Sequence, residues 1–435
     1  ALLWPLIIEQ ALGVLVGMAD TVMVSSVGEA AISGVSLVDM INQLIITVFG
    51  ALATGGAVVT SQHLGAKRPE EAARSAGQLV GLSGILGTAV AAFCLVTRTA
   101  QLRLFFGTIS EDVMQACLIY FTITALSFPF LALYNAGAAI FRSTGNSAVS
   151  MKVSVLVNAI NFCGNALCVF VLRMGVAGVA VPTLISRAVG AVIILSLAAR
   201  RDYVLRITPR TVTRLEGRTV RSILYIGIPS AFENSLFQLG RVLVVSMISL
   251  FGTVHISANA VANNLDAVGC IVGNAMGLAM ITVVGRCVGA QDFEQTKHYT
   301  KKLLLWDYIA QGTVNLLVLF FLNRILGMYT LSPETRALSW TLVMIHNGVA
   351  ILLWPAGFVL PNALRAANDV RFTMVTSILS MIVWRMGLSW ILCVNMGMGA
   401  VGVWLAMVVD WICRVTCFVI RFASGAWQKS AMKKV

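Results

Sequence analysis

Long apolar runs alternate with short polar loops along the whole chain. Most runs hold about 20 residues or more, the length that an α-helix needs to cross the hydrocarbon core of a bilayer. Because lipid offers no partners to unpaired backbone groups, the runs are predicted to be helices rather than strands of an open sheet. The predicted fold class is therefore an all-α integral membrane protein. The pattern predicts twelve transmembrane helices, at residues 2–26, 32–61, 73–97, 113–141, 149–172, 176–198, 222–250, 256–285, 300–323, 337–364, 371–395 and 399–422.

The composition agrees with this prediction. Hydrophobic residues make up 58% of the 435 positions and charged residues 11%, and the mean hydropathy is +0.87. A soluble globular chain carries about 25% charged residues. The first apolar run is long and has no small-residue cleavage site, so we expect it to be a membrane span and not a removed signal peptide.

The 31 Lys and Arg residues are distributed unevenly between the predicted loops. Most of them lie in loops after even-numbered spans or after the last span. Cytoplasmic loops carry the basic excess, so both termini are predicted to be cytoplasmic in a multi-pass protein of the inner (plasma) membrane. The same loops explain the net charge of +13. This pattern favours contact with membrane lipids and not with nucleic acid, which would need a basic face on a soluble domain.

Residue types in the first apolar runs recur in the second half of the chain. Over residues 5–71, many positions match the residue that lies 224 positions later, without a gap. A similar offset relates the fifth and sixth predicted spans to the last two. Internal repeats in membrane transporters place the substrate between two related halves, which rock against each other. The matched pairs include Pro5 with Pro229, Glu9 with Glu233, Gly28 with Gly252, Ser33 with Ser257 and Glu70 with Glu294.

The longest and most basic polar stretch separates the two halves, at residues 199–221. Each half would form a lobe of six helices, and the lobes would be related by pseudo-symmetry. We therefore predict an amino-terminal lobe at 1–198, a basic cytoplasmic linker at 199–221, a carboxyl-terminal lobe at 222–425 and a cytoplasmic tail at 426–435.

Four short segments carry a recognisable combination of residues. They are Gly-Met-Ala-Asp-Thr-Val-Met-Val at 17–24, Ser-Gln-His-Leu-Gly-Ala-Lys-Arg-Pro-Glu-Glu-Ala at 61–72, Phe-Arg-Ser-Thr-Gly-Asn at 141–146 and Leu-Arg-Ala-Ala-Asn-Asp at 364–369. With Pro5 ahead of the first segment, the set resembles the bacterial type of the multidrug and toxic compound extrusion (MATE) family. The resemblance covers essentially the whole chain. It implies a V-shaped arrangement of two six-helix lobes and the export of drugs.

Asp20 lies deep in the first predicted span, between apolar residues and Thr21. A carboxylate inside a membrane is costly and is a functional candidate for that reason. Burial disfavours the charged form, so Asp20 can exchange a proton, or a cation can hold it ionised. The alternative is a structural hydrogen bond between helices.

The fifth predicted span presents Asn158, Asn161 and Asn165 on one helical face, because they are spaced three and four residues apart. Amide oxygens suit Na⁺ or a polar substrate, and amides can also hydrogen-bond a carboxyl group. The alternative is a ladder of amides that joins helices.

The resemblance implies an ion-coupling site in this part of the chain. MATE proteins with a cation site in the amino-terminal lobe have an Asp in helix 1, an Asn and an Asp four residues apart in helix 5, and a Thr in helix 6. One negative charge of that pattern is missing here, because the second Asp is an Asn. This departure weakens Na⁺ binding and favours a proton or a weak cation site. The matching positions are Asp20, Asn161, Asn165 and Thr183.

The second half has its own charged residues inside predicted spans. An arginine in a membrane needs an acidic partner, so we expect Arg241 to pair with Asp410 or Glu233. Asp410 and Arg414, one helical turn apart, are another candidate pair. Glu233 resembles a helix 7 Glu that some MATE members use for cation binding, although the helix 10 Asp of those members is absent. A coupling site and a static network of ion pairs are both open. The second-lobe candidates are Glu233, Arg241, Asp266 and Asp410, with Arg385, Arg414 and His346 nearby in the sequence pattern.

Pro5 interrupts the hydrogen-bond pattern of the first predicted helix. The resemblance implies that the helix bends at Pro5 when Asp20 changes state. The alternative is a fixed kink.

The sequence holds no motif for a cofactor or for catalysis. The nine cysteines lie in or at the ends of apolar runs without zinc spacing, and the four histidines form no HExxH motif. A GxxxxGK[ST] phosphate loop is absent, so the energy is expected to come from an ion gradient. We predict no enzyme activity, no cofactor, and no metal other than Na⁺ as one of two candidate coupling ions.

These observations together predict a multidrug efflux transporter that works as a monomer. It would be a secondary antiporter that exchanges H⁺ or Na⁺ for small organic, cationic compounds by alternating access. The alternative is an exporter or flippase of lipid-linked precursors or metabolites in the same superfamily, a group that resembles a fourteen-helix design. A different twelve-helix transporter class would need a basic sequence between helices 2 and 3. A membrane enzyme would need clustered catalytic residues.

Overall fold

The computed structural model describes residues 2–107 and 109–432, and all regular elements in these ranges are helical. This confirms the all-α prediction. The chain divides into two compact units, Ala1–Ala231 and Phe232–Val435. The boundary between them lies inside one long helix, α9 (Gly217–Ser249), which begins within the predicted linker.

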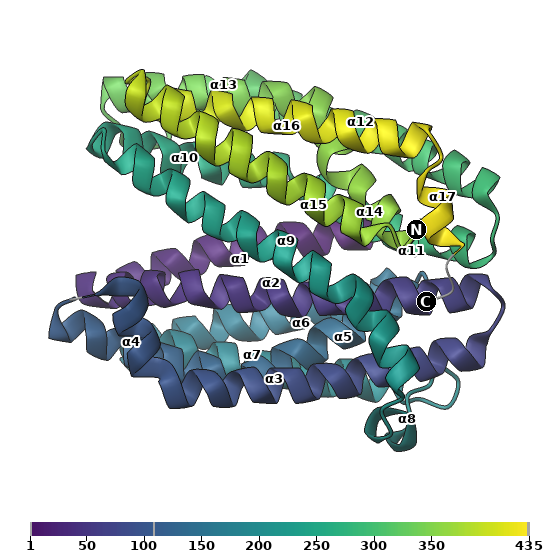
Figure 1. The fold of residues 1–435 in the computed structure, drawn as a ribbon. Helices are drawn as coiled ribbons and strands as arrows, with labels where there is room; N and C mark the ends of the chain where they lie inside the picture. Colours follow the sequence, from purple (N-terminus) through teal and green to yellow (C-terminus); the bar gives the residue numbers. More distant parts are fainter. Residues whose placement is uncertain (1, 108, 433–435) are drawn as a thin grey trace. The chain divides into compact units, whose positions relative to one another are not determined.

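The first unit contains long helices that run roughly antiparallel to one another (Figure 1). Their bounds are α1 (Leu3–Ser25), α2 (Glu29–Gly65), α3 (Pro69–Phe106), α4 (Glu111–Leu126), α5 (Phe128–Ser143), α6 (Ser147–Ala166), the π-helical η1 (Leu167–Val171), α7 (Ala177–Ala198) and the short α8 (Pro209–Thr213).

The second unit repeats this arrangement with more π-helical segments. Its elements are α10 (Thr253–Gly269), α11 (Ile271–Gly289), α12 (Phe293–Gly327), α13 (Pro333–Trp354), η2 (Pro355–Val359), α14 (Leu360–Ala366), α15 (Val370–Ser380), η3 (Met381–Leu388), η4 (Trp390–Asn395), α16 (Ala400–Ala423) and α17 (Trp427–Ala431).

All twelve predicted spans coincide with helices. Among the described residues, ten helices are long and apolar enough to cross a membrane, and eleven if α4 and α5 form one span bent by 44°. The remaining predicted span, at 222–250, is α9, which carries Glu233 and Arg241. The bend between α4 and α5 falls at Ser127 and Pro129, where the proline removes a backbone donor.

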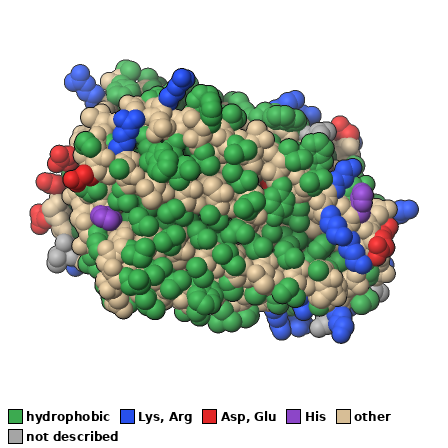
Figure 2. All heavy atoms as spheres, turned by 90° about the horizontal axis from the view of Figure 1, so that it is seen from above, with side chains coloured by type: hydrophobic (Ala, Val, Ile, Leu, Met, Phe, Trp, Pro, Cys, Tyr) green, Lys and Arg blue, Asp and Glu red, His purple; other side chains and the backbone are tan. Residues whose placement is uncertain are grey.

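Apolar side chains cover the middle of the face shown in Figure 2, and the charged side chains gather at its two ends. On α12 the exposed apolar residues include Leu305, Ile309, Leu316 and Phe320. An apolar belt between two charged rims is the surface that a bilayer requires.

The internal repeat extends to the backbone of the turns. Four turns of the first unit and their counterparts in the second contain residues with a positive φ angle, at positions that correspond with an offset of 223 or 224. Glycine favours this left-handed region because it has no Cβ atom. Both halves therefore use the same turn geometry between corresponding helices. The pairs are Gly28 (φ 139°) with Gly252 (89°), Lys67 (59°) with Gln291 (57°), Gly145 (83°) with Asn368 (63°), and Gly175 (62°) with Gly399 (58°).

A buried glutamine on α3 holds the basic linker. The Gln78 amide nitrogen donates to the carbonyl oxygens of Thr211 at 2.8 Å and Arg214 at 2.6 Å. Its amide oxygen accepts from the backbone nitrogen of Glu216 at 2.7 Å. The side chain of Gln78 thus satisfies three backbone groups of an otherwise irregular segment.

Pro5 lies in the first turn of α1, which begins at Leu3. The backbone N–H groups of a first turn have no partner within the helix, so Pro5 removes no helical hydrogen bond in this position. Bending at Pro5 and a fixed kink there both stay predictions.

Candidate functional site

The four residues of the predicted first-lobe site lie together in the first unit. Asp20 of α1 is half-buried, and its Oδ1 accepts a hydrogen bond of 2.8 Å from Asn165 Nδ2 on α6. Asn165 is fully buried and also donates to Asn161 Oδ1 at 3.2 Å. Asn161 Nδ2 in turn donates to Thr183 Oγ1 on α7 at 2.9 Å. The chain of contacts joins three helices around one carboxylate.

The orientation of the Asn161 amide determines how many donors Asp20 has. With the amide turned by 180°, its nitrogen lies 3.3 Å from both carboxylate oxygens of Asp20, and its oxygen lies 2.9 Å from Thr183 Oγ1. In both orientations Asn161 stands between Asp20 and Thr183. Thr183 already donates to the carbonyl of Val179, which favours the orientation in which Asn161 donates to Thr183.

Asn158 is separate from this cluster, which the shared helical face did not predict. Its amide nitrogen donates to Ser154 Oγ at 3.2 Å within α6.

A second carboxylate of the first unit, Asp39, accepts from Asn42 at 3.2 Å and from Tyr120 at 3.0 Å.

In each unit a glutamate pairs with an arginine at corresponding places in the repeat. In the first unit Arg142 Nη1 lies 3.4 Å from Glu9 Oε1, and Ser150 Oγ donates to Glu9 Oε2 at 3.0 Å. In the second unit Arg365 Nη2 lies 2.8 Å from Glu233 Oε1. Both ion pairs link the first helix of a unit to the end of its fourth span.

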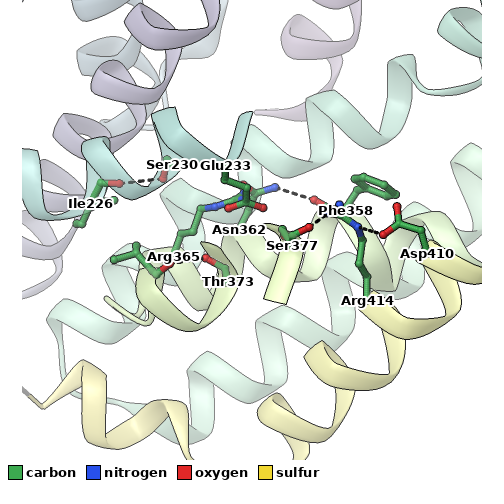
Figure 3. A network of polar contacts seen from close by, with 11 residues as sticks. Ile226, Ser230, Glu233, Phe358, Asn362, Arg365, Thr373, Ser377, Asp410 and Arg414 are labelled. Atoms are coloured by element: carbon green, nitrogen blue, oxygen red, sulfur yellow. Dashed lines mark hydrogen bonds and ion pairs between the residues drawn. The ribbon is translucent and has the colours of Figure 1, made fainter. Parts of the chain in front are cut away.

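The expected pairing of Arg241 with Glu233 or Asp410 is wrong. Glu233 pairs with Arg365, which also donates to Asn362 Oδ1 at 2.7 Å. Figure 3 shows Arg365 directed toward Glu233. The physical reason is that the fold places Arg365, near the end of α14, within bonding distance of Glu233. Arg241 is on the same helix as Glu233, α9, but lies two turns further along.

The alternative pair of Asp410 with Arg414 is present and almost completely buried. Arg414 Nε lies 3.0 Å from Asp410 Oδ1, and the two side chains are 4% and 0% exposed. Ser380 Oγ donates to Asp410 Oδ1 at 2.6 Å. Arg414 donates to the Ser377 carbonyl at 3.0 Å, as Figure 3 shows. Such a bonded pair is static, since either charge alone would be costly to bury.

The second unit contains a partly open cavity of about 110 Å³ with an aromatic wall. This volume holds several waters or a small group, but it is below the range of about 300–1,000 Å³ that is typical of drug-sized sites. Arg241, Arg385 and Asp266 bring charge to the lining. The aromatic lining residues are Phe237, Trp354, Phe358, Trp404 and Trp411.

Asp266 of α10, His346 of α13 and Cys270 form a hydrogen-bonded group beside this cavity. His346 Nε2 lies 2.6 Å from Asp266 Oδ1, and Cys270 Sγ donates to the same oxygen at 3.2 Å. The three ligand atoms lie within 4.8 Å of one another. Because Asp266 Oδ1 bonds both partners directly, these hydrogen bonds explain the cluster without a metal ion.

The sequence patterns did not select two kinds of residue that the structure places at candidate sites. The partners Arg142 and Arg365 were placed in loops, and only their position in the fold shows that they reach Glu9 and Glu233. Asp307 lies inside the predicted span at 300–323 and is fully buried on α12. The rule that selected Asp20, a carboxylate inside an apolar run, would also have selected Asp307.

The internal repeat is also the unit in which the chain matches known proteins. The MatE family model matches residues 5–167 and again residues 229–391, an offset of 224 positions. The two matches together cover more than half of the chain. The chain belongs to the MatE family. The predicted resemblance to MATE transporters is confirmed, and the protein is a multi-pass membrane transporter.

Curated bacterial relatives of this MatE protein align over nearly its full length. The "Uncharacterized transporter YisQ" of Bacillus subtilis is 27% identical over 442 residues, which cover 99% of this chain and 95% of the relative. The "Probable multidrug resistance protein NorM" of Thermotoga maritima is 24% identical, over 98% of this chain and 91% of the relative.

The fold matches that of solved MATE structures. The outward-facing conformation of a multidrug resistance MATE family transporter superposes with a TM-score of 0.91 at 20% identity, covering 98% of this chain and 95% of the other. The two-lobe fold of this MatE protein is therefore confirmed.

Proposed function

We propose that this MatE protein is a secondary antiporter that couples inward movement of H⁺ or Na⁺ to outward movement of small organic compounds, cationic ones among them. The observation that carries the proposal is the setting of Asp20. Its bonded neighbour is the amide of Asn165, and among the described residues no ion pair joins it to a basic side chain. The names of the relatives, such as the multidrug resistance protein NorM, support small organic substrates.

A carboxylate in this setting binds a positive charge from solution. In surroundings of low dielectric constant, the ionised form is disfavoured unless a proton neutralises it or a cation stays beside it. Binding changes the charge of the cluster that joins α1, α6 and α7 by one unit. Coupling follows when the ion and the drug favour opposite states of the same two-state equilibrium.

The ligands around Asp20 fit either ion. A proton needs only the carboxylate. For Na⁺, the buried Asn165 Oδ1, which has no hydrogen-bond partner among the described residues, is a further oxygen ligand. With one carboxylate instead of two, the Na⁺ site would be weak.

The membrane location and orientation are part of the proposal. The basic loops favour an inner-membrane protein with both termini in the cytoplasm. In that orientation the antiporter exports its substrates from the cell. One chain contains both lobes of the fold, which supports a functional monomer.

The test is ethidium transport by everted vesicles under an imposed pH gradient and, separately, a Na⁺ gradient. We expect Asp20→Asn to lose gradient-driven transport at least about tenfold, which corresponds to about 1.4 kcal/mol. Asp202→Asn, the same change at an exposed site, is the matched control and should transport like the wild type. The gradient that drives the wild type identifies the ion. Full transport by Asp20→Asn would show that coupling does not depend on Asp20.

A second candidate function is the export of an anionic metabolite or lipid-linked precursor. It is favoured by Arg241 and Arg385, which line the cavity of the second unit and have no carboxylate paired to them among the described residues. An anionic group would bind them by charge-assisted hydrogen bonds. If anionic rather than cationic dyes compete for transport, this candidate replaces the first.

A further inference from the structure

Asp307 is a carboxylate without a partner in the middle of α12. It is 0% exposed, and neither of its oxygens has a hydrogen-bond partner among the described residues. An ionised carboxylate buried in this way, with neither a countercharge nor a donor, is strongly disfavoured. The geometry therefore corresponds to a neutral Asp307 that holds a proton.

Two further buried polar groups, one on α12 and one on α13, also lack hydrogen-bond partners among the described residues. Gln311 lies one helical turn further along α12 and is 0% exposed, and both its amide oxygen and its amide nitrogen are unpaired. The indole nitrogen of Trp354 is unpaired as well. Gln311 Oε1 and Trp354 Nε1 both lie against Gly273 of α11, where a Cβ atom would collide with them. Native proteins rarely leave such groups unsatisfied, so a cluster of them needs a specific explanation.

The donors and acceptors of this cluster match each other. The Trp354 N–H can donate to Gln311 Oε1, and a Gln311 amide N–H can donate to an ionised Asp307. The three residues can therefore form one series of hydrogen bonds, from Trp354 through Gln311 to Asp307. A Na⁺ ion would engage the oxygens of Asp307 and Gln311 but would leave the two N–H donors without acceptors, so the donor set favours a proton.

The other titratable groups on the elements packed against α12 are engaged elsewhere or lie at helix ends. Cys270, between α10 and α11, and His346 on α13 each bond Asp266 on α10. Arg365 on α14 pairs with Glu233. The segment η2 contributes none, and Tyr308 is the titratable neighbour on α12 itself. Those at or near helix ends are His255, Arg286, Cys287, Glu334 and Arg336.

We propose that Asp307 is a proton-binding site of the second lobe, linked through Gln311 to Trp354. The O–H bond of Asp307 breaks, the proton passes to water, and the carboxylate accepts the Gln311 N–H. Gln311 Oε1 then accepts the indole N–H of Trp354. Trp354 also lines the aromatic cavity and stacks on Phe358, with 4.1 Å between the ring centroids. Protonation thereby changes one wall of that cavity, and this deepens the proposed ion coupling, on which its role in transport rests.

The experiment is an infrared pH titration of the purified full-length protein in lipid, which follows the C=O stretching band of protonated carboxyl groups. The wild type should lose a band with rising pH, and Asp307→Asn should lack that band. Glu294→Gln is the matched control, because Glu294 is exposed on the same helix and pairs with Lys297. An Asp307→Asn titration identical to that of the wild type would overturn the proposal. So would a band that responds to Na⁺ at constant pH.

A second measurement covers the case in which Asp307→Asn does not fold. Gln311→Met leaves the carboxyl group in place but removes the link to Trp354. We expect its carboxyl band still to titrate while the pH-dependent change in tryptophan fluorescence falls to the level of Trp354→Phe. An unchanged fluorescence response in both variants would contradict the link.

The outcomes separate this inference from the proposed function. The infrared readout needs no transport, so a titrating Asp307 in a protein that moves no substrate would leave the site standing and overturn the antiporter. Gradient-driven transport by a protein whose Asp307 band does not titrate would support the antiporter and overturn the proton site at Asp307.

Discussion

The two lobes of this MatE protein share a frame but hold their membrane carboxylates differently. In the first lobe, Asp20 is bonded to the amide of Asn165, without an arginine partner among the described residues. In the second lobe, Glu233 and Asp410 are bonded to Arg365 and Arg414. A carboxylate fixed by an arginine stays charged, whereas one surrounded by amides can exchange its ion. Of these three carboxylates, Asp20 is therefore the one that we propose to exchange an ion.

The ion pairs Glu9–Arg142 and Glu233–Arg365 show which charges belong to the shared frame. The glutamates are 224 positions apart and the arginines 223. Other corresponding positions hold different residue types in the two halves, and these differences give each lobe its own chemistry. Counting 224 positions on from Asn161 leads to Arg385, so an amide beside Asp20 corresponds to a cation that lines the second cavity.

The largest expected effect comes from removing Arg414. Arg414→Leu leaves the charge of Asp410 buried without a partner and should lower the free energy of unfolding by about 3–5 kcal/mol. The double variant with Asp410→Leu should recover most of that loss, because neither charge is then buried alone. Thermal melting of the purified protein measures both. The exposed Arg218→Leu is the control, with a change of about 0.5 kcal/mol or less. Normal stability of Arg414→Leu would mean that the pair is not structural.

The next effect compares the two equivalent ion pairs. Arg142→Met and Arg365→Met should each lower the free energy of unfolding, by roughly 2–4 kcal/mol. The loss should be larger for Arg365, whose contact with Glu233 is 2.8 Å against 3.4 Å for Arg142 with Glu9. The melting temperatures of the two variants test the order. If Arg365→Met stays stable and loses gradient-driven transport, Glu233 takes part in coupling and the contrast between the lobes fails.

A smaller change tests the missing charge of the first lobe. Asn165→Asp places a second carboxylate beside Asp20 and should strengthen Na⁺ binding about tenfold, or about 1.4 kcal/mol. The readout is the Na⁺ concentration that half-saturates thermal stabilisation. Asn158→Asp is the matched control, since the Asn158 amide bonds Ser154 instead of Asp20. An equal response of the two variants would show that position 165 has no special role.

The smallest effects distinguish the asparagines of α6 from one another. Asn158→Ala should change the free energy of unfolding by about 0.6 kcal/mol or less, because its bond to Ser154 lies within α6 and about 0.6 kcal/mol is the average even for polar contacts between membrane helices. Asn161→Ala should cost about 1–2 kcal/mol, because it removes the link between Asp20 and Thr183. Melting curves compare them. Equal losses would favour a simple ladder of amides along the helix.

The sequence by itself determined the features that depend on local composition. The apolar runs marked the long helices, though not the short α8 and α17, because lipid tolerates only apolar side chains and paired backbone groups. The repeat identified related halves, and the family pattern selected Asp20, Asn161, Asn165 and Thr183, which the fold brings together.

Only the tertiary structure decided which charged groups meet. Glu233 and Arg365 are 132 positions apart, and no local pattern indicates that they bond each other rather than Arg241. In the same way, Asp307 is visible in the sequence as a carboxylate in an apolar run, but its lack of a partner follows from packing. A side chain's partner depends on which helices lie side by side, and long-range packing sets that arrangement, whereas hydropathy and spacing act over a few turns.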